Sequence, residues 1–206
     1  RVRKEAWYPG ETLIVGIGQG SFLTTPLQLA AATAAMANHG RYIVPRMVKA
    51  TRAGVGKPLV PTVPEGHQVP VDDPRQWQDV IDAMAQVVEG GRGTARRIYS
   101  DDYRIAGKTG TSQVFTVGQN ESYNESEVAE RMRDHALFVA FAPVEAPRIA
   151  VAIIVENGGH GGSVAAPIAR AVMDSYLLGE RVPDPFEAAV RGLGRGQGES
   201  ENENER

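Results

Sequence analysis

The sequence predicts an α/β (α+β) chain in which a central antiparallel sheet is covered by helices on both faces. Three segments have the character of strands, residues 104–114, 136–141 and 149–155, and a short turn between two prolines joins the last two. These last two strands are continuously apolar, without the polar alternation of a half-exposed strand. Such strands are buried on both sides, so helices are expected on each face of the sheet.

Helix signals lie on either side of these strands. Thr25, Pro26 and Gln28 form a capping box with proline at the first helical position. They predict a helix that runs to about His39 and ends at Gly40, apolar nearly all round and therefore deeply buried. Two further helices are predicted, one that starts at Asp73–Pro74 and stops at Gly90–Gly91 and one over residues 167–178.

Two other stretches are expected to connect these elements. Residues 41–70 contain five prolines around short apolar pieces, which predicts edge strands and turns with little chemistry. Residues 115–134 are polar, and a connection of about 20 residues is typical of a lid, a binding loop or disorder. The interpretation we favour is a disordered segment with a short helix near residues 128–132.

Composition places the chain among ordinary globular proteins, with 42% apolar and 23% charged residues. No apolar run approaches the roughly 20 residues that a helix needs to cross a bilayer. The net charge of −3 comes from the glutamate-rich end of the chain, so no nucleic-acid surface is indicated. Residues 1–182 are assigned to the folded domain and 183–206 to a disordered acidic tail.

One motif carries the chemistry, the sequence R-I-A-G-K-T-G-T-S-Q from Arg104 to Gln113. Its Gly107-Lys108-Thr109 also resembles the end of a phosphate-binding loop, which requires a glycine five residues earlier. Asp102 occupies that position, and Gly110 begins the required helix poorly, so a phosphate-binding loop is rejected. A glycine pattern at residues 16–20 fails the test for a dinucleotide site, because its sixth position is not glycine and no acidic partner follows at the right distance.

The motif Lys108-Thr109-Gly110-Thr111 has the form of the third active-site element of penicillin-recognising serine acyltransferases. With it, the chain resembles the transpeptidase domain of class B penicillin-binding proteins over about residues 5–180, most closely the members that act in cell elongation. Four blocks carry the resemblance in order: Trp7–Gly10 with Val15–Gly20 and Thr25–Pro26, then Gly93–Ala95, then Ala106–Thr111, then Glu156–Gly159 to Ala165–Pro167.

The resemblance implies a penicillin-binding, β-lactamase-like transpeptidase fold that is incomplete in this chain. The family needs a Ser-x-x-Lys nucleophile, which occurs nowhere in the sequence, and a Ser-x-Asn before the Lys-Thr-Gly. The only Ser-x-Asn, at residues 122–124, follows it. Together with a first residue that is Arg1, this predicts that residues 1–182 are the carboxy-terminal part of the domain and that an upstream segment carries the serine.

The resemblance also implies a peptidoglycan D,D-transpeptidase that forms an acyl-serine and is inhibited by β-lactams. Lys108 then stabilises the substrate carboxylate and the proton relay, and the Thr111 amide stabilises the oxyanion. The hydroxyls of Thr109 and Thr111 bond the carboxylate, and Gly110 permits close approach. Weaker substrate contacts are assigned to Ser112, His160 and Gln19. Neither a metal nor a cofactor is implied.

Two alternatives remain open at this point. Water in place of the acceptor amine gives a D,D-carboxypeptidase or a β-lactamase, and loss of turnover gives a sensor or scaffold that binds β-lactam or peptidoglycan. Implied partners are peptidoglycan stem peptides, β-lactam antibiotics and a shape-determining glycosyltransferase of the elongation complex. The implied location is the periplasm, with an amino-terminal helix of the whole protein anchored in the inner membrane.

Overall fold

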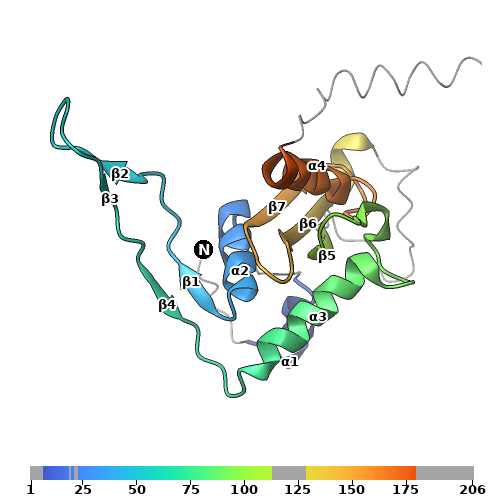
Figure 1. The fold of residues 1–206 in the computed structure, drawn as a ribbon. Coiled ribbons are helices and arrows are strands. Elements are labelled where there is room, and N and C mark those ends of the chain that lie inside the picture. Colours follow the sequence, from blue (N-terminus) through green and yellow to red (C-terminus); the bar gives the residue numbers. More distant parts are fainter. Residues whose placement is uncertain (1–6, 19, 21–22, 113–128, 180–206) are drawn as a thin grey trace, which may run out of the picture. The chain divides into compact units, whose positions relative to one another are not determined.

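The computed structural model describes residues 7–18, 20, 23–112 and 129–179 of the chain (Figure 1). It divides into two compact units, Arg1–Arg170 and Ala171–Arg206, which we describe separately. Within the described ranges, no helix has both the length and the apolar character needed to cross a membrane. The predicted acidic tail, residues 183–206, and Gln19 lie outside the described residues.

The centre of the first unit is a sheet of three antiparallel strands. These are β5 (Ala106–Ser112), β6 (His135–Ala142) and β7 (Ile149–Val155), in the order β5-β6-β7. The register aligns Ala106, Phe141 and Ala150 across the sheet. The three predicted strands and the hairpin between the last two are confirmed. Among the described residues, β5 is an edge strand.

Helix α2 (Pro26–Ala37) begins as the sequence predicts. The Gln28 amide donates to the Thr25 hydroxyl at 3.2 Å, and the Thr25 amide donates to the Gln28 side chain at 2.9 Å. The helix stops at Ala37, and Gly40 turns the chain with a φ of 87°. The predicted capping box and the terminating glycine are therefore confirmed.

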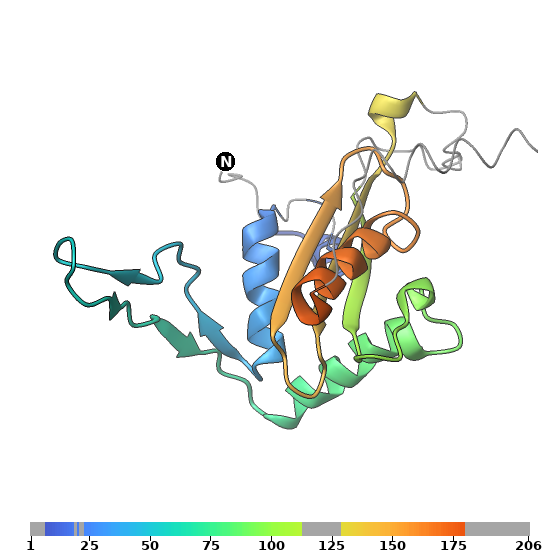
Figure 2. The same cartoon turned by 45° about the horizontal axis from the view of Figure 1, so that its top comes forward.

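The expectation that α2 is buried on all sides is wrong. Its four buried residues lie between the middle and the end of the helix, while Leu27 in the first turn is 64% exposed. The helix lies along β7, as both views show, and it also contacts β6 (Figures 1 and 2). One sheet covers only one side of a helix, so the described residues leave part of the opposite side of α2 exposed, including Leu27. The four buried residues are Ala31, Thr33, Ala35 and Ala37.

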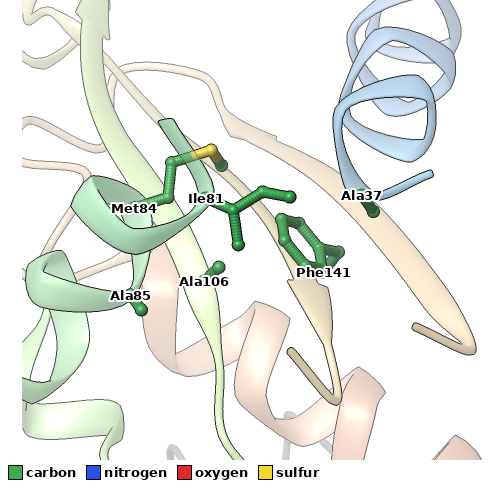
Figure 3. Close-up of a cluster of buried hydrophobic side chains, with 6 residues drawn as sticks. All are labelled: Ala37, Ile81, Met84, Ala85, Ala106 and Phe141. Carbon is green, nitrogen blue, oxygen red and sulfur yellow. The ribbon is translucent and has the colours of Figure 1, made fainter. Parts of the chain in front are cut away.

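Helix α3 (Arg75–Glu89) packs against β5 with one apolar stripe. The Arg75 amide donates to the Asp73 carboxylate at 3.0 Å, which places the helix start where the sequence predicts it. The stripe meets the end of α2 and the sheet in a buried cluster (Figure 3). The members of this cluster are Ala37, Ile81, Met84, Ala85, Ala106 and Phe141.

A long hairpin separates α2 from α3. Near its base, β1 (Arg41–Ile43) pairs with β4 (Gly66–Gln68), and further out β2 (Ala50–Thr51) pairs with β3 (Val60–Pro61). All four pieces are short, and the two ladders are antiparallel. The prediction of edge strands and turns over residues 41–70 is confirmed.

The remaining elements are short or terminal. Helix α1 (Pro9–Gly16) has no buried residue and was not predicted. The described residues include the single 3₁₀ turns η1 (Arg96–Ile98) and η3 (Glu130–Met132), and the second confirms a short helix near residues 128–132. Residues 113–128 of the polar connection lie outside the described residues.

Helix α4 (Ala165–Leu178) begins two residues before the predicted start at residue 167. The boundary between the two compact units falls inside it. The described part of the second unit, from Ala171, continues the helix to Leu178. Gly179 follows with a φ of 75°, which confirms the predicted end.

Candidate active site

The Lys-Thr-Gly motif lies in the middle of edge strand β5. The register pairs Lys108 with Val139 and Gly110 with Leu137 on the neighbouring strand. Side chains alternate between the two faces of a strand, so Lys108 and Gly110 lie on one face while Thr109 and Thr111 lie on the other. The motif therefore presents a cation on one face of the edge strand and two hydroxyls on the opposite face.

A cleft of about 370 Å³ runs along this strand. All five residues from Lys108 to Ser112 line it, so the structure brings together every site residue predicted on β5. Its other walls are mainly apolar and come from the sheet, the start of α2 and the segment before α2. These wall residues are Ile17, Gly18, Leu23, Thr24, Pro26, Leu29, Leu137, Val139, Ala152, Ile153 and Ile154.

Lys108 is exposed and its ammonium donates to the Thr109 carbonyl at 2.7 Å. It also lines a second, shallower hollow of about 470 Å³, between β5 and the end of α3. That hollow is bounded by the glycine-rich turn Gly90–Gly93, with Thr94 at its end. Lys108 offers a cation on one face of the strand, and Thr109 and Thr111, which also line the cleft, offer hydroxyls on the other face. Groups of this kind along one strand edge can bind a carboxylate.

One contact was missed by sequence reasoning. The hydroxyl of Thr94 lies 3.0 Å from the hydroxyl of Thr109. Thr94 belongs to a block that was noted in the sequence, but no role was attached to it. The only signal was its place in the Gly-Thr-Ala triplet, and nothing in that triplet indicates which strand it meets.

The glycine loop after β7 packs against the back of the motif. An added Cβ at Gly161 would fall far inside contact distance of the Leu137 carbonyl, and 2.7 Å from the Gly110 carbonyl. At Gly162 it would collide with the Thr94 carbonyl and lie 3.5 Å from the Thr109 methyl. These two glycines allow the loop to support β5 and the Thr94 turn together.

His160 lies in the same loop and is exposed. Its carbonyl accepts bonds from the Ser163 and Val164 amides, which tie the loop to the start of α4. It does not line either hollow that includes Lys108. Its assignment as a substrate contact stays a prediction.

Ion pairs hold the chain just before β5. The Arg104 guanidinium bonds the Glu89 carboxylate at 2.7 Å and 2.8 Å and the Glu145 carboxylate at 2.7 Å. These hydrogen bonds raise the pKa of Arg104, and Arg104 in turn holds the pKa of Glu145 below its ordinary value. The pairs therefore join the end of α3, the start of β5 and the turn between β6 and β7.

Fold and motif agree with one protein family. Residues 2–174 match the model of the penicillin binding protein transpeptidase domain, and the chain belongs to this family. A curated relative is the peptidoglycan D,D-transpeptidase MrdA of Acinetobacter baumannii, 48% identical over 179 residues. The match covers 86% of this chain and 26% of the relative, so the chain spans about a quarter of that protein.

Three solved structures show the same fold. Pseudomonas aeruginosa PBP2 in complex with WCK 5153 has a TM-score of 0.68 at 45% identity, over 90% of this chain and 38% of that one. The imipenem acyl-enzyme of penicillin-binding protein A from M. tuberculosis has a TM-score of 0.62 at 30% identity, over 80% and 33%. The complex of PBP2 and MreC from Helicobacter pylori has a TM-score of 0.63 at 30% identity, over 85% and 29%.

Proposed function

We propose that this chain is the carboxy-terminal part of the transpeptidase domain of a peptidoglycan D,D-transpeptidase that is inhibited by β-lactams. The observation that carries the proposal is the single cleft lined by every residue from Lys108 to Ser112. The curated relative, with 48% identity, is named for this activity. The reaction joins stem peptides through an acyl-serine intermediate, and the serine lies in a segment of the whole protein outside these 206 residues.

Lys108 acts at the reacting centre. Lys108 lines the cleft, and its side chain lies on the same face of the sheet as that of its partner Val139, which lines the cleft as well. A fixed positive charge there stabilises the negative charge that develops when the serine attacks the D-Ala carbonyl. It also favours the proton transfer that such an attack requires.

The neighbouring residues bind the substrate. Thr109 and Thr111 supply hydroxyls for the terminal carboxylate, and the Thr111 amide supplies one donor for the oxyanion. Gly110 leaves the groove open, since an added Cβ would already lie 3.3 Å from the Leu137 Cβ. Ser112 extends the same row of polar groups along the cleft.

His160 is a further proposed substrate contact with weaker support. That support is its exposed position and the close packing of the next residue, Gly161, against Gly110. A histidine at this place can donate to a carbonyl of a long stem peptide beyond the cleft.

The apolar side of the cleft is where we place the segment that carries the serine. Leu23 is 91% exposed, Leu27 64% and Ile154 42%. Leu23 and Ile154 line the cleft itself. Contiguous exposed apolar residues of this kind mark an interaction surface. A companion segment that covers them also brings its serine next to Lys108.

Lys108→Ala in the complete protein tests the proposal. Acylation by a labelled penicillin is expected to slow at least ~100-fold, because charge stabilisation and proton transfer are lost together. Lys57→Ala is the matched control, since Lys57 is exposed in the hairpin far along the chain from the motif. Near-normal acylation of the Lys108 variant contradicts the proposal.

Product analysis separates the three reaction classes. With a stem-peptide donor and an amine acceptor, a transpeptidase gives the cross-linked product. A D,D-carboxypeptidase or β-lactamase gives the hydrolysed product, and a sensor gives a stable complex without turnover. Only the cross-linked product supports the transpeptidase assignment.

The partners and location follow from the same assignment. We propose that the whole protein lies in the periplasm, anchored to the inner membrane by an amino-terminal helix, and works with a shape-determining glycosyltransferase. Residues 183–206 are proposed to be an acidic tail without a role in acyl transfer. The solved complex of PBP2 and MreC from Helicobacter pylori shows that one relative assembles with another protein, which supports the proposal that the whole protein has protein partners.

A further inference from the structure

Thr94 lies beside the Lys-Thr-Gly strand and has no assigned role. It follows the glycine turn at the end of α3, and its hydroxyl is 3.0 Å from that of Thr109. The two residues belong to different segments, so their contact depends on the tertiary fold. Thr94 also lines the second hollow together with Lys108.

The Thr94 turn is fixed tightly to α3. The Ala95 amide donates to the Val87 carbonyl at 3.0 Å, and Ala95 is fully buried. An added Cβ on Gly93 would collide with the same Val87 carbonyl. The backbone that carries the Thr94 hydroxyl therefore has little freedom to move away from β5.

The side chain of Thr109 is confined on both of its branches. Its methyl group packs toward Gly162, where an added Cβ would be 3.5 Å away. Its hydroxyl faces the hydroxyl of Thr94. A β-branched side chain has few staggered conformations, so these two neighbours together select one of them.

The direction of the hydrogen bond follows from the ligand. A threonine hydroxyl has one proton to donate and two lone pairs that accept. A carboxylate has no proton, so Thr109 must donate its own proton to such a ligand. Thr94 must then be the donor in the bond between the two hydroxyls, which leaves the Thr109 proton directed at the ligand.

We propose that Thr94 is a positioning residue that orients the Thr109 hydroxyl toward the carboxylate of the stem peptide or of a β-lactam. This inference rests on the proposed function, in which Thr109 binds that carboxylate. A donor behind the Thr109 hydroxyl also polarises it, which strengthens the bond that Thr109 makes to the anion. Thr94 itself does not touch the ligand.

The experiment compares Thr94→Val and Thr94→Ser in the complete protein. Valine keeps the shape and removes the hydroxyl, whereas serine keeps the hydroxyl. Acylation is measured with a penicillin and with the same penicillin whose carboxylate is blocked as a methyl ester. Thr51→Val, at an exposed position in the hairpin, is the matched control.

With the free penicillin, Thr94→Val is expected to lower the second-order acylation constant about 10-fold, the usual effect of losing one hydrogen bond. Thr94→Ser and Thr51→Val stay within about 2-fold of wild type. With the methyl ester, Thr94→Val matches wild type, because no anion remains for Thr109 to hold. In a Thr109→Val background, Thr94→Val has no further effect.

Two results overturn the inference. One is wild-type acylation of Thr94→Val with the free penicillin. The other is an equal loss with both ligands, which assigns Thr94 to general support of the domain. Failure of the wild-type protein to be acylated is a separate result, and it overturns the proposed function.

Discussion

Strand β5 and the hairpin from Arg41 to Gln68 are both exposed edges of antiparallel ladders, but they are held in different ways. All seven residues of β5 pair with β6, and its start at Ala106 is fully buried. The two ladders of the hairpin contain three and two pairs. Met47, between the two ladders, and Val55, at the outer end of the hairpin, are fully exposed.

Tertiary support is concentrated on β5. Ion pairs of Arg104 hold its start, and Gly161 and Gly162 press against its middle from the back. The hairpin is fixed mainly at its base, where Gly40 packs against Trp77 and the Gln68 side chain bonds the His39 carbonyl at 2.8 Å. Close packing is therefore concentrated around the motif, and the acyl transfer that we propose would require such fixed positions of the groups that bind substrate.

Among the variants that test the comparison of β5 with the hairpin, Gly162→Ala is expected to lower stability and acylation the most. The new methyl group collides with the Thr94 carbonyl, which is part of a turn that cannot retreat. Overpacking of this kind costs about 1–3 kcal/mol. Unfolding of the complete protein by urea measures the loss, and penicillin acylation is expected to fall at the same time because the collision displaces the glycine loop that supports β5.

Gly91→Ala is the matched control for this variant. Nothing lies within 4 Å of the position that a Cβ would take at Gly91, although Gly91 lies in the glycine-rich turn just before Thr94. Its stability is expected to equal or slightly exceed that of wild type. Equal stability of the Gly162 and Gly91 variants contradicts the claim that the loop supports β5 by close approach.

The sequence predicts those parts of the fold and of the candidate site that depend on local signals. The capping box at Thr25, the strands around Lys108 and the apolar stripe on α3 follow from spacing, and the structure confirms them. The motif itself is contiguous, so its five residues were certain to lie together. Local patterns are enough wherever neighbours in sequence are also neighbours in space.

Contacts between distant segments could not be predicted in this way. The bond of Thr94 to Thr109 and the packing of Gly162 on the Thr94 carbonyl depend on how three segments meet. The burial of α2 was misjudged for a related reason. An apolar side chain such as Leu27 indicates that a face needs a cover, but not that the cover lies within these residues.

Glu145→Gln is expected to have a smaller effect than Gly162→Ala, with a defined dependence on pH. Arg104 lowers the pKa of Glu145 from its ordinary value of 4.5. A carboxylate with a lowered folded-state pKa stabilises the fold above its unfolded pKa, and this contribution is lost as the pH falls through the folded value. The variant is therefore less stable than wild type at pH 7, and the difference disappears in acid.

Urea unfolding at a series of pH values measures this difference. The Glu145 side chain is 57% exposed, so solvent screens the pair and the loss at pH 7 stays within about 1 kcal/mol. Glu65→Gln, in the hairpin, is the matched control for the loss of one carboxylate. A difference between Glu145→Gln and wild type that grows toward low pH contradicts the assigned ion pair.

Val55→Thr is expected to have the smallest effect, and it tests the hairpin side of the comparison. Val55 is fully exposed, so the added hydroxyl stays in water and stability changes by no more than about 0.5 kcal/mol. The same substitution at Val88, which is 1% exposed in α3, buries a hydroxyl and costs about 1–3 kcal/mol. Both variants are made in the complete protein, and their urea unfolding and penicillin acylation are compared with those of wild type. A loss of stability at Val55 as large as that at Val88 means that the outer end of the hairpin is covered in the whole protein.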